Sequence, residues 1–207
     1  MSDRSDRAVE RYVALGDSYT IGEGVEADDA WPSLLTAHLR RQGIALDLVA
    51  NPSVTGWTSK QLIDHELPVF EASRPTFATL LIGVNDWVQG VPPDDFADRL
   101  ATIVERVRAA LPDSRKLLLV TIPDFSVTPE ARRYARGRDI AREIAGFNDI
   151  VRAAAERAAV PLVDIFPLSQ RLTGAEYLAD DDLHPSAAAY TEWERLIYPV
   201  ARDLLAH

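Results

Sequence analysis

The sequence contains a serine, a histidine and an aspartate whose types and spacing could perform acyl transfer. Ser18 follows an apolar segment in "YVALGDSYTIGEG", and His184 lies in "DDDLHPS" with Asp181 three residues before it. A serine hydroxyl becomes a good nucleophile when a base removes its proton, and histidine is the base suited to neutral pH. The histidine needs an acceptor for its other ring N–H, which Asp181 can provide from the same loop. We therefore predict that these three residues act together.

Acyl transfer also requires donors for the oxyanion that forms in its transition state. Asn85 in "GVNDW" carries a side-chain amide, and Gly56 in "NPSVTGWTS" allows its backbone to approach a ligand closely. We predict an oxyanion hole built from the backbone N–H groups of Ser18 and Gly56 and the amide of Asn85. Trp57 and Trp87 lie next to these donors and are interpreted as lining an acyl or alcohol pocket, with ordinary packing as the alternative.

The elements that must position these residues are short apolar strands alternating with longer helices. Nearly continuous runs of Val, Ile and Leu are typical of strands buried on both faces of a parallel sheet. Five such strands are predicted, at Tyr12–Leu15, Leu46–Ala50, Phe77–Ile82, Lys116–Ile122 and Pro161–Ile165. Helices are predicted at Trp31–Arg41 and Phe96–Leu111, over a long segment from Ala131 interrupted near Gly137, and at Pro185–Leu205 with Pro185 as first residue.

This alternation predicts an α/β sandwich around a parallel sheet. Ligands of such sheets bind at the carboxyl ends of the strands, and every candidate residue follows a predicted strand end. We see no linker or internal repeat, so residues 1–207 are expected to form one domain, with residues 1–10 as a flexible extension.

Composition excludes several classes of function. The chain has no cysteine, which rules out disulfides, thiol nucleophiles and cysteine zinc sites. Its net charge of −10 argues against nucleic acid or an anionic membrane as the main partner. No apolar run approaches the roughly 20 residues that span a bilayer. The polar start "MSDRSDRAVERYV" lacks a secretory signal, which predicts a cytoplasmic protein, or a secreted one if the sequence is a trimmed mature form.

Other polar residues have simpler interpretations. His38, His65 and His207 are read as surface residues, and the scattered histidines predict no metal site. In the run Asp180–Asp182, Asp181 is preferred as the partner of His184, with its two neighbours as alternatives. Asp17 and Asp86 are expected to support their loops through hydrogen bonds to backbone. A cluster of arginines either recognises an anionic substrate or forms a solvated helical face; it consists of Arg132, Arg133, Arg136 and Arg138.

Four blocks taken together resemble the SGNH (GDSL-type) hydrolases. "GDSYTIGEG", the Asn51/Gly56 segment, "GVND" and "DxxHP" occur in that order between about residues 12 and 190. The resemblance implies a three-layer sandwich with a five-stranded, flavodoxin-like parallel sheet. It also implies that Ser18 is the nucleophile, His184 the general base and Asp181 its partner, without a cofactor or metal. Tyr19 departs from the family pattern, which has leucine there; a tyrosine changes packing near the nucleophile.

The resemblance implies a serine hydrolase that cleaves esters of small or medium acyl chains through an acyl-enzyme. Alternatives within the same site are a thioesterase, a carbohydrate deacetylase, a lysophospholipase or an acyltransferase. A non-catalytic ligand-binding module is the alternative from another class. The sequence leaves the oligomeric state open.

Overall fold

The computed structural model describes residues 9–206, and its centre is a five-stranded parallel sheet. The strand order is β2-β1-β3-β4-β5, and every neighbouring pair is parallel. The strands are β1 (Glu10–Gly16), β2 (Leu46–Ala50), β3 (Phe77–Leu81), β4 (Leu117–Val120) and β5 (Leu162–Val163). The predicted α/β class and parallel sheet are confirmed. Residues 1–8 of the predicted extension lie outside the described residues, and its last residue, Glu10, already pairs with Leu46.

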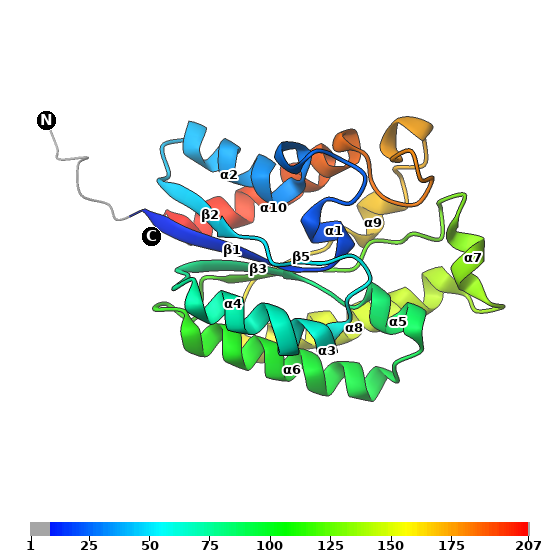
Figure 1. The fold of residues 1–207 in the computed structure, drawn as a ribbon, viewed down its shortest axis with the longest axis horizontal. Coiled ribbons are helices and arrows are strands. Elements are labelled where there is room, and N and C mark those ends of the chain that lie inside the picture. The colour runs from blue at the N-terminus through cyan, green and yellow to red at the C-terminus, as the bar shows by residue number, and fades with distance from the viewer. Residues whose placement is uncertain (1–8, 207) are drawn as a thin grey trace, which may run out of the picture.

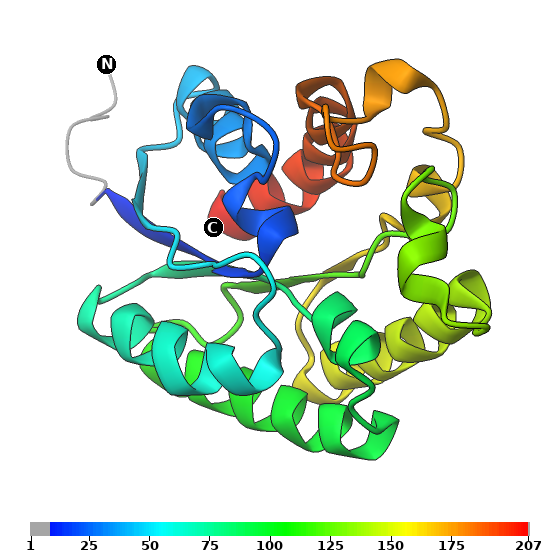
Figure 2. The ribbon, with the colours of Figure 1, turned by 45° about the vertical axis from the view of Figure 1, so that its right-hand side comes forward.

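Helices cover both faces of the sheet (Figures 1 and 2). The helices α2 (Trp31–Arg41) and α10 (Ala187–Leu205) pack together on one face. The helices α4 (Leu67–Ala72), α6 (Pro93–Ala110) and α8 (Ile140–Ala158) lie on the other. This arrangement gives three layers.

The shorter helical elements complete the chain. They are α1 (Ser18–Ile21), α3 (Ser59–Gln61), α5 (Val84–Gln89), α7 (Ala131–Ala135), α9 (Phe166–Ser169), the π-helical turn Leu62–Glu66 and the 3₁₀ turns Ala27–Asp29 and Ala175–Tyr177. Figure 1 shows α1, α5 and α7 at the end of the sheet away from the carboxyl end of α10. That end holds the carboxyl ends of the strands. Within residues 9–206, no helix is both long and apolar enough to cross a bilayer.

Two predicted boundaries were wrong for a similar reason. In both places a side chain forms hydrogen bonds with backbone groups at the end of the element. The predicted strand to Ile122 ends at Val120, since the side chain of Asn148 on α8 pairs with both the N–H and the C=O of Ile122 at 2.8 Å. The last helix begins after Pro185, not at it. The hydroxyl of Ser186 caps α10 by accepting from the N–H of Ala189.

The interruption predicted near Gly137 is confirmed. α7 ends at Ala135, and Gly137 has a φ of +82°, in the left-handed region that glycine adopts without strain. α8 then starts at Ile140, where Asp139 caps it by accepting from the N–H of Arg142. The two helices after β4 are therefore separate elements, and α7 is free to sit at the carboxyl edge of the sheet.

Candidate active site

Ser18 lies at the switch point of the sheet, where the chain order of the strands reverses. β1 lies between β2 and β3, so the loops that leave β1 and β3 diverge there and open a crevice. β1 ends at Gly16, where a Cβ would lie 2.4 Å from the carbonyl oxygen of Leu81, so only glycine fits. Asp17 then caps α1, accepting from the N–H of Tyr19 at 3.1 Å, and Ser18 is the first residue of this short helix. The sequence thus turns out of the sheet within two residues.

His184 and Asp181 form a hydrogen-bonded pair on the loop before α10. The Nδ1 of His184 lies 2.5 Å from the Oδ2 of Asp181. Burial opposes ionisation of Asp181, but hydrogen bonds from the ring and N–H of His184 and from the N–H of Leu183 outweigh it and hold its pKa below the usual range. An ionised Asp181 accepts from Nδ1–H, which leaves Nε2 of His184 as the proton acceptor. Of the three neighbouring aspartates, Asp181 is the one that contacts the ring.

Asn85 and Gly56, the two other predicted oxyanion donors, lie on segments that are joined to each other by hydrogen bonds. The Nδ2 of Asn85 donates to the carbonyl oxygen of Trp57 at 2.9 Å, and the Nε2 of Gln89 donates to that of Gly56 at 3.0 Å. Gly56 has a φ of +83°, which favours glycine. These bonds hold the loop after β2 against α5. The amide of Asn85 retains a second N–H for a ligand.

Asp86 was expected to support its own loop through nearby backbone, but its partner in the structure is Ser59, which sequence reasoning missed. The buried carboxylate of Asp86 accepts from the N–H of Ser59 at 2.8 Å and from its hydroxyl at 2.5 Å, across 27 residues of chain. Arg99 lies 3.7 Å from the same carboxylate. Burial raises the pKa of Asp86, and these partners oppose the rise. The capping box of Thr58 and Gln61 was a visible signal for a helix start here, but its distant partner was not.

One cavity of about 270 Å³ brings four predicted residues together: Ser18, Gly56, Asn85 and His184. Asp181 reaches it through His184. Much of the remaining wall is apolar or aromatic, and Thr55 and Gln89 add polar side chains. The apolar and aromatic residues are Tyr19, Val84, Val88, Phe125, Tyr134 and Leu183. The cavity therefore combines a hydroxyl, an imidazole and amide donors with an apolar surface.

The two tryptophans are not among the residues that line this cavity. Trp87 is on α5, but its ring is buried, and its Nε1 donates to Glu143 at 2.8 Å. Trp57 lies against the ring of His65, with 5.2 Å between centroids. Trp57 and Trp87 therefore do not line this cavity, and their part in substrate binding stays a prediction. Val84 and Val88, on the same helix as Trp87, line the cavity instead.

Arg138 explains part of the arginine cluster. Its guanidinium carbon lies 3.6 Å from the centroid of the Trp87 ring, and its Nη1 donates to the Trp87 carbonyl at 2.8 Å. Arg133 pairs with Glu130 over 2.7 Å. Arg138 therefore fastens the segment after β4 to the end of α5, and it does not belong to a free helical face.

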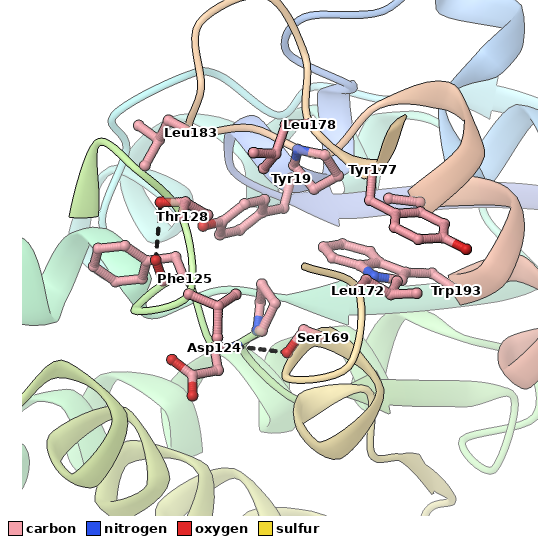
Figure 3. A pocket seen from close by; sticks show the side chains of 14 residues that line it. Tyr19, Asp124, Phe125, Thr128, Ser169, Leu172, Tyr177, Leu178, Leu183 and Trp193 are labelled. Carbon is pink, nitrogen blue, oxygen red and sulfur yellow. Dashed lines mark hydrogen bonds between the residues drawn. The ribbon is translucent and has the colours of Figure 1, made fainter. Parts of the chain in front are cut away.

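Tyr19 lines both the cavity that contains Ser18 and a second, smaller one. This second cavity holds about 30 Å³, and Tyr19, Phe125 and Leu183 contribute to the walls of both. The ring of Tyr19 meets His184 and Trp193 edge to face, with centroids 5.9 Å and 5.8 Å apart; Figure 3 shows Tyr19 and Trp193 lining the space. The departure from leucine thus places an aromatic wall beside His184.

The remaining histidines have structural surroundings. His38 is not a plain surface residue, because its Nδ1 lies 2.8 Å from Glu194 and its ring stacks on Tyr198 at 3.7 Å. His65 is exposed, as predicted, and His207 lies outside the described residues. Within residues 9–206, no group of three or more acidic or histidine side chains could hold a metal ion.

Comparison with known proteins identifies the family. The chain is 26% identical over 203 residues to the arylesterase of Vibrio mimicus, covering 98% of this chain and 92% of that protein. It is 26% identical over 183 residues to thioesterase 1/protease 1/lysophospholipase L1 of Escherichia coli K12, covering 88% and 78%. The crystal structure of TesA matches with a TM-score of 0.75 and 26% identity, covering 95% of this chain and all of that one. Residues 14–191 match the model of the GDSL-like lipase/acylhydrolase family, and the chain belongs to that family.

Proposed function

We propose that Ser18 is the nucleophile of a carboxylic ester hydrolase that works through an acyl-enzyme, with His184 as general base and Asp181 as its partner. Membership of the family, with relatives named arylesterase and esterase TesA, makes the chain an ester hydrolase. The observation that supports the residue roles is the single cavity shared by Ser18, His184, Gly56 and Asn85, with Asp181 bound to the far side of the imidazole.

In the first half of the reaction, Ser18 Oγ attacks the ester carbonyl while Nε2 of His184 takes its proton. The bond between Oγ and the carbonyl carbon forms, and the carbonyl oxygen becomes an oxyanion. The N–H groups of Ser18 and Gly56 and the free N–H of Asn85 donate to it. Asp181 stabilises the imidazolium without taking its proton. The imidazolium then protonates the leaving alcohol as its bond to the acyl group breaks.

In the second half, water attacks the acyl-enzyme with His184 again as base. The carboxylic acid leaves and Ser18 regains its proton. The chain's own residues supply every proton transfer in this scheme.

The substrate we propose carries a small or medium acyl chain. A cavity of about 270 Å³ lies just below the roughly 300–1,000 Å³ typical of ligand pockets. Val84 and Val88 on α5, together with Phe125 and Tyr134, offer an apolar wall next to the oxyanion donors, where the acyl chain would lie.

Hydrolysis of p-nitrophenyl esters from acetate to octanoate tests the proposal. Wild type is compared with Ser18→Ala and with Ser33→Ala, a half-buried serine on α2. We expect Ser18→Ala to lose at least about a thousandfold in kcat/KM, some 4 kcal/mol of transition-state stabilisation, and Ser33→Ala to match wild type. An equal, weak rate in wild type and Ser18→Ala would overturn the assignment and favour a non-catalytic binding module.

A thioesterase is the second candidate, because one relative carries that name and the same nucleophile and oxyanion hole serve thioesters. Comparing kcat/KM for an oxyester and a thioester with the same acyl group and similar leaving groups separates the two. A thioester preference of tenfold or more would support the second candidate, and the reverse preference the first.

A further inference from the structure

The helix that follows the oxyanion loop contains an unusual turn. Between α3 and α4, residues Leu62–Glu66 are π-helical, with the N–H of Leu67 bonded to the carbonyl of Leu62. Such turns are rare and occur frequently at functional sites. Here the turn exposes Asp64 and His65 but buries Glu66 completely. The wide turn therefore delivers a carboxyl group to the interior.

Glu66 binds the backbone just before the nucleophile. Its Oε2 accepts from the N–H of Gly16 at 3.0 Å, and Gly16 is the residue at which β1 turns toward Ser18. The same residue lies so close to Leu81 that no Cβ fits. Glu66 thus holds one side of the bend while β3 confines the other.

A second buried acid lies in the same bend. Asp17 is completely buried; its Oδ1 accepts from Tyr19, and its Oδ2, like the Oε1 of Glu66, has no hydrogen-bond partner within residues 9–206. Burial raises the pKa of both carboxyl groups to about 8, and each acid has a further carboxylate near it that adds to the rise. The charge of Asp17 raises the pKa of Glu66, and the charge of Asp86 raises the pKa of Asp17. Arg99 lies beside Asp86.

We propose that Glu66 is a positioning residue for the nucleophile: its buried carboxyl group accepts from Gly16 N–H and so fixes the bend that aims Ser18 into the cavity it shares with His184. This inference rests on the proposed role of Ser18. A protonated carboxyl offers an acceptor oxygen and one O–H donor; a glutamine side chain offers the same acceptor oxygen, with two N–H donors in place of the O–H. The contact needs the length of the side chain and its acceptor, and it does not need the negative charge.

Three variants test this role: Glu66→Gln, Glu66→Asp and the control Glu194→Asp. Glu194 is also a buried acid, but it lies on α10 and binds His38, away from the cavity that contains Ser18. A fluorophosphonate that labels Ser18 counts the competent sites, and turnover of p-nitrophenyl butyrate is expressed per labelled site. This normalisation removes losses caused by unfolded protein.

We expect Glu66→Gln to keep kcat within threefold of wild type. Glu66→Asp retains the acid but withdraws its acceptor from Gly16, and we expect at least a tenfold lower kcat with KM within twofold, since small misplacements of a reacting group affect turnover strongly. Glu194→Asp should melt at a lower temperature while its kcat per site stays at the wild-type value.

Wild-type kcat per site in Glu66→Asp would assign Glu66 a purely structural role and overturn the proposal. Loss of turnover in Glu66→Gln equal to that in Glu66→Asp would overturn it too, since the charge would then be what matters. Failure of the proposed function is a different result: wild type would not react with the fluorophosphonate, or Ser18→Ala would retain wild-type turnover.

Discussion

The side-chain amide of Asn85 donates a hydrogen bond to the carbonyl oxygen of Trp57 over 2.9 Å, joining α5 to the loop that carries Gly56. This contact fixes the rotation of the Asn85 amide, so its remaining N–H has a defined direction. A donor that is oriented before the substrate arrives needs no reorganisation in the transition state. Two segments that follow different strands thereby form one oxyanion hole in the proposed mechanism.

Replacing Asn85 by alanine removes one proposed oxyanion donor. We expect kcat for p-nitrophenyl butyrate to fall by about 10²–10³. Because the substitution also breaks the bond to Trp57, Gln89→Ala serves as the control, since it removes the neighbouring bond to the Gly56 carbonyl and leaves Asn85 intact. A loss in Gln89→Ala as large as that in Asn85→Ala would show that holding the loop, and not donation to the oxyanion, is the main role of Asn85.

Gly56 and Gly43 offer a matched pair for testing the second donor. Their φ values are +83° and +84°, and a Cβ on either would meet no atom within 4 Å. Alanine at each position should therefore lose a similar free energy of unfolding, about 1–2 kcal/mol, from left-handed strain alone. Only Gly56→Ala should also lower kcat, because it shifts the N–H that we propose donates to the oxyanion. Denaturant unfolding and steady-state kinetics on both variants check this, and equal kcat values would contradict the assignment of Gly56.

Arg138 should stabilise the segment after β4. Arg138→Ala removes both the stacking on Trp87 and the bond to its carbonyl oxygen, and we expect a loss of about 1–3 kcal/mol in the free energy of unfolding. Arg132→Ala, at an exposed position on α7, is the control and should change stability by less than about 0.5 kcal/mol. Equal unfolding midpoints for the two variants would contradict the role given to Arg138.

Stability should fall as the pH rises through neutrality because of the buried acids. Glu66 ionises near its ordinary pKa of 4.5 in the unfolded chain, whereas in the folded protein its pKa is about 8. Between these values the folded state binds more protons than the unfolded one, so the free energy of unfolding decreases with pH, by up to about 1.4 kcal/mol per pH unit for one such group. Below pH 4.5 the contribution of Glu66 to the free energy of unfolding no longer changes with pH.

Glu66→Gln removes that titration. Relative to wild type, the variant should therefore gain stability steadily from about pH 5 to pH 8, as measured by urea unfolding at a series of pH values. Parallel curves for the two proteins would show that Glu66 is ionised in the folded state.

The local pattern of the sequence was enough to predict the class of fold and the location of the candidate site. Runs such as Phe77–Leu81 are buried along their whole length, and this continuity distinguishes a central parallel strand from an amphipathic one. Asp181 and His184 were predicted as a pair because three residues on one loop bring their side chains within reach. Ser18 and Asn85 were predicted to meet because the carboxyl ends of parallel strands lie on one edge. All of these arguments use short-range spacing or a general property of sheets.

What remained undetermined depends on contacts between residues far apart in the chain. Three features each require a partner on another element. They are the bond from Ser59 to Asp86, the π-helical turn that brings Glu66 to Gly16, and the orientation of the Trp87 ring toward Glu143 and Arg138. A sequence pattern shows which face of a helix is apolar. It does not show whether an apolar side chain on that face packs in the protein interior or lines the cavity. The sequence by itself therefore determined the chemistry of the site, and the tertiary structure decided which residues hold and line it, because packing selects among side-chain orientations that are locally equivalent.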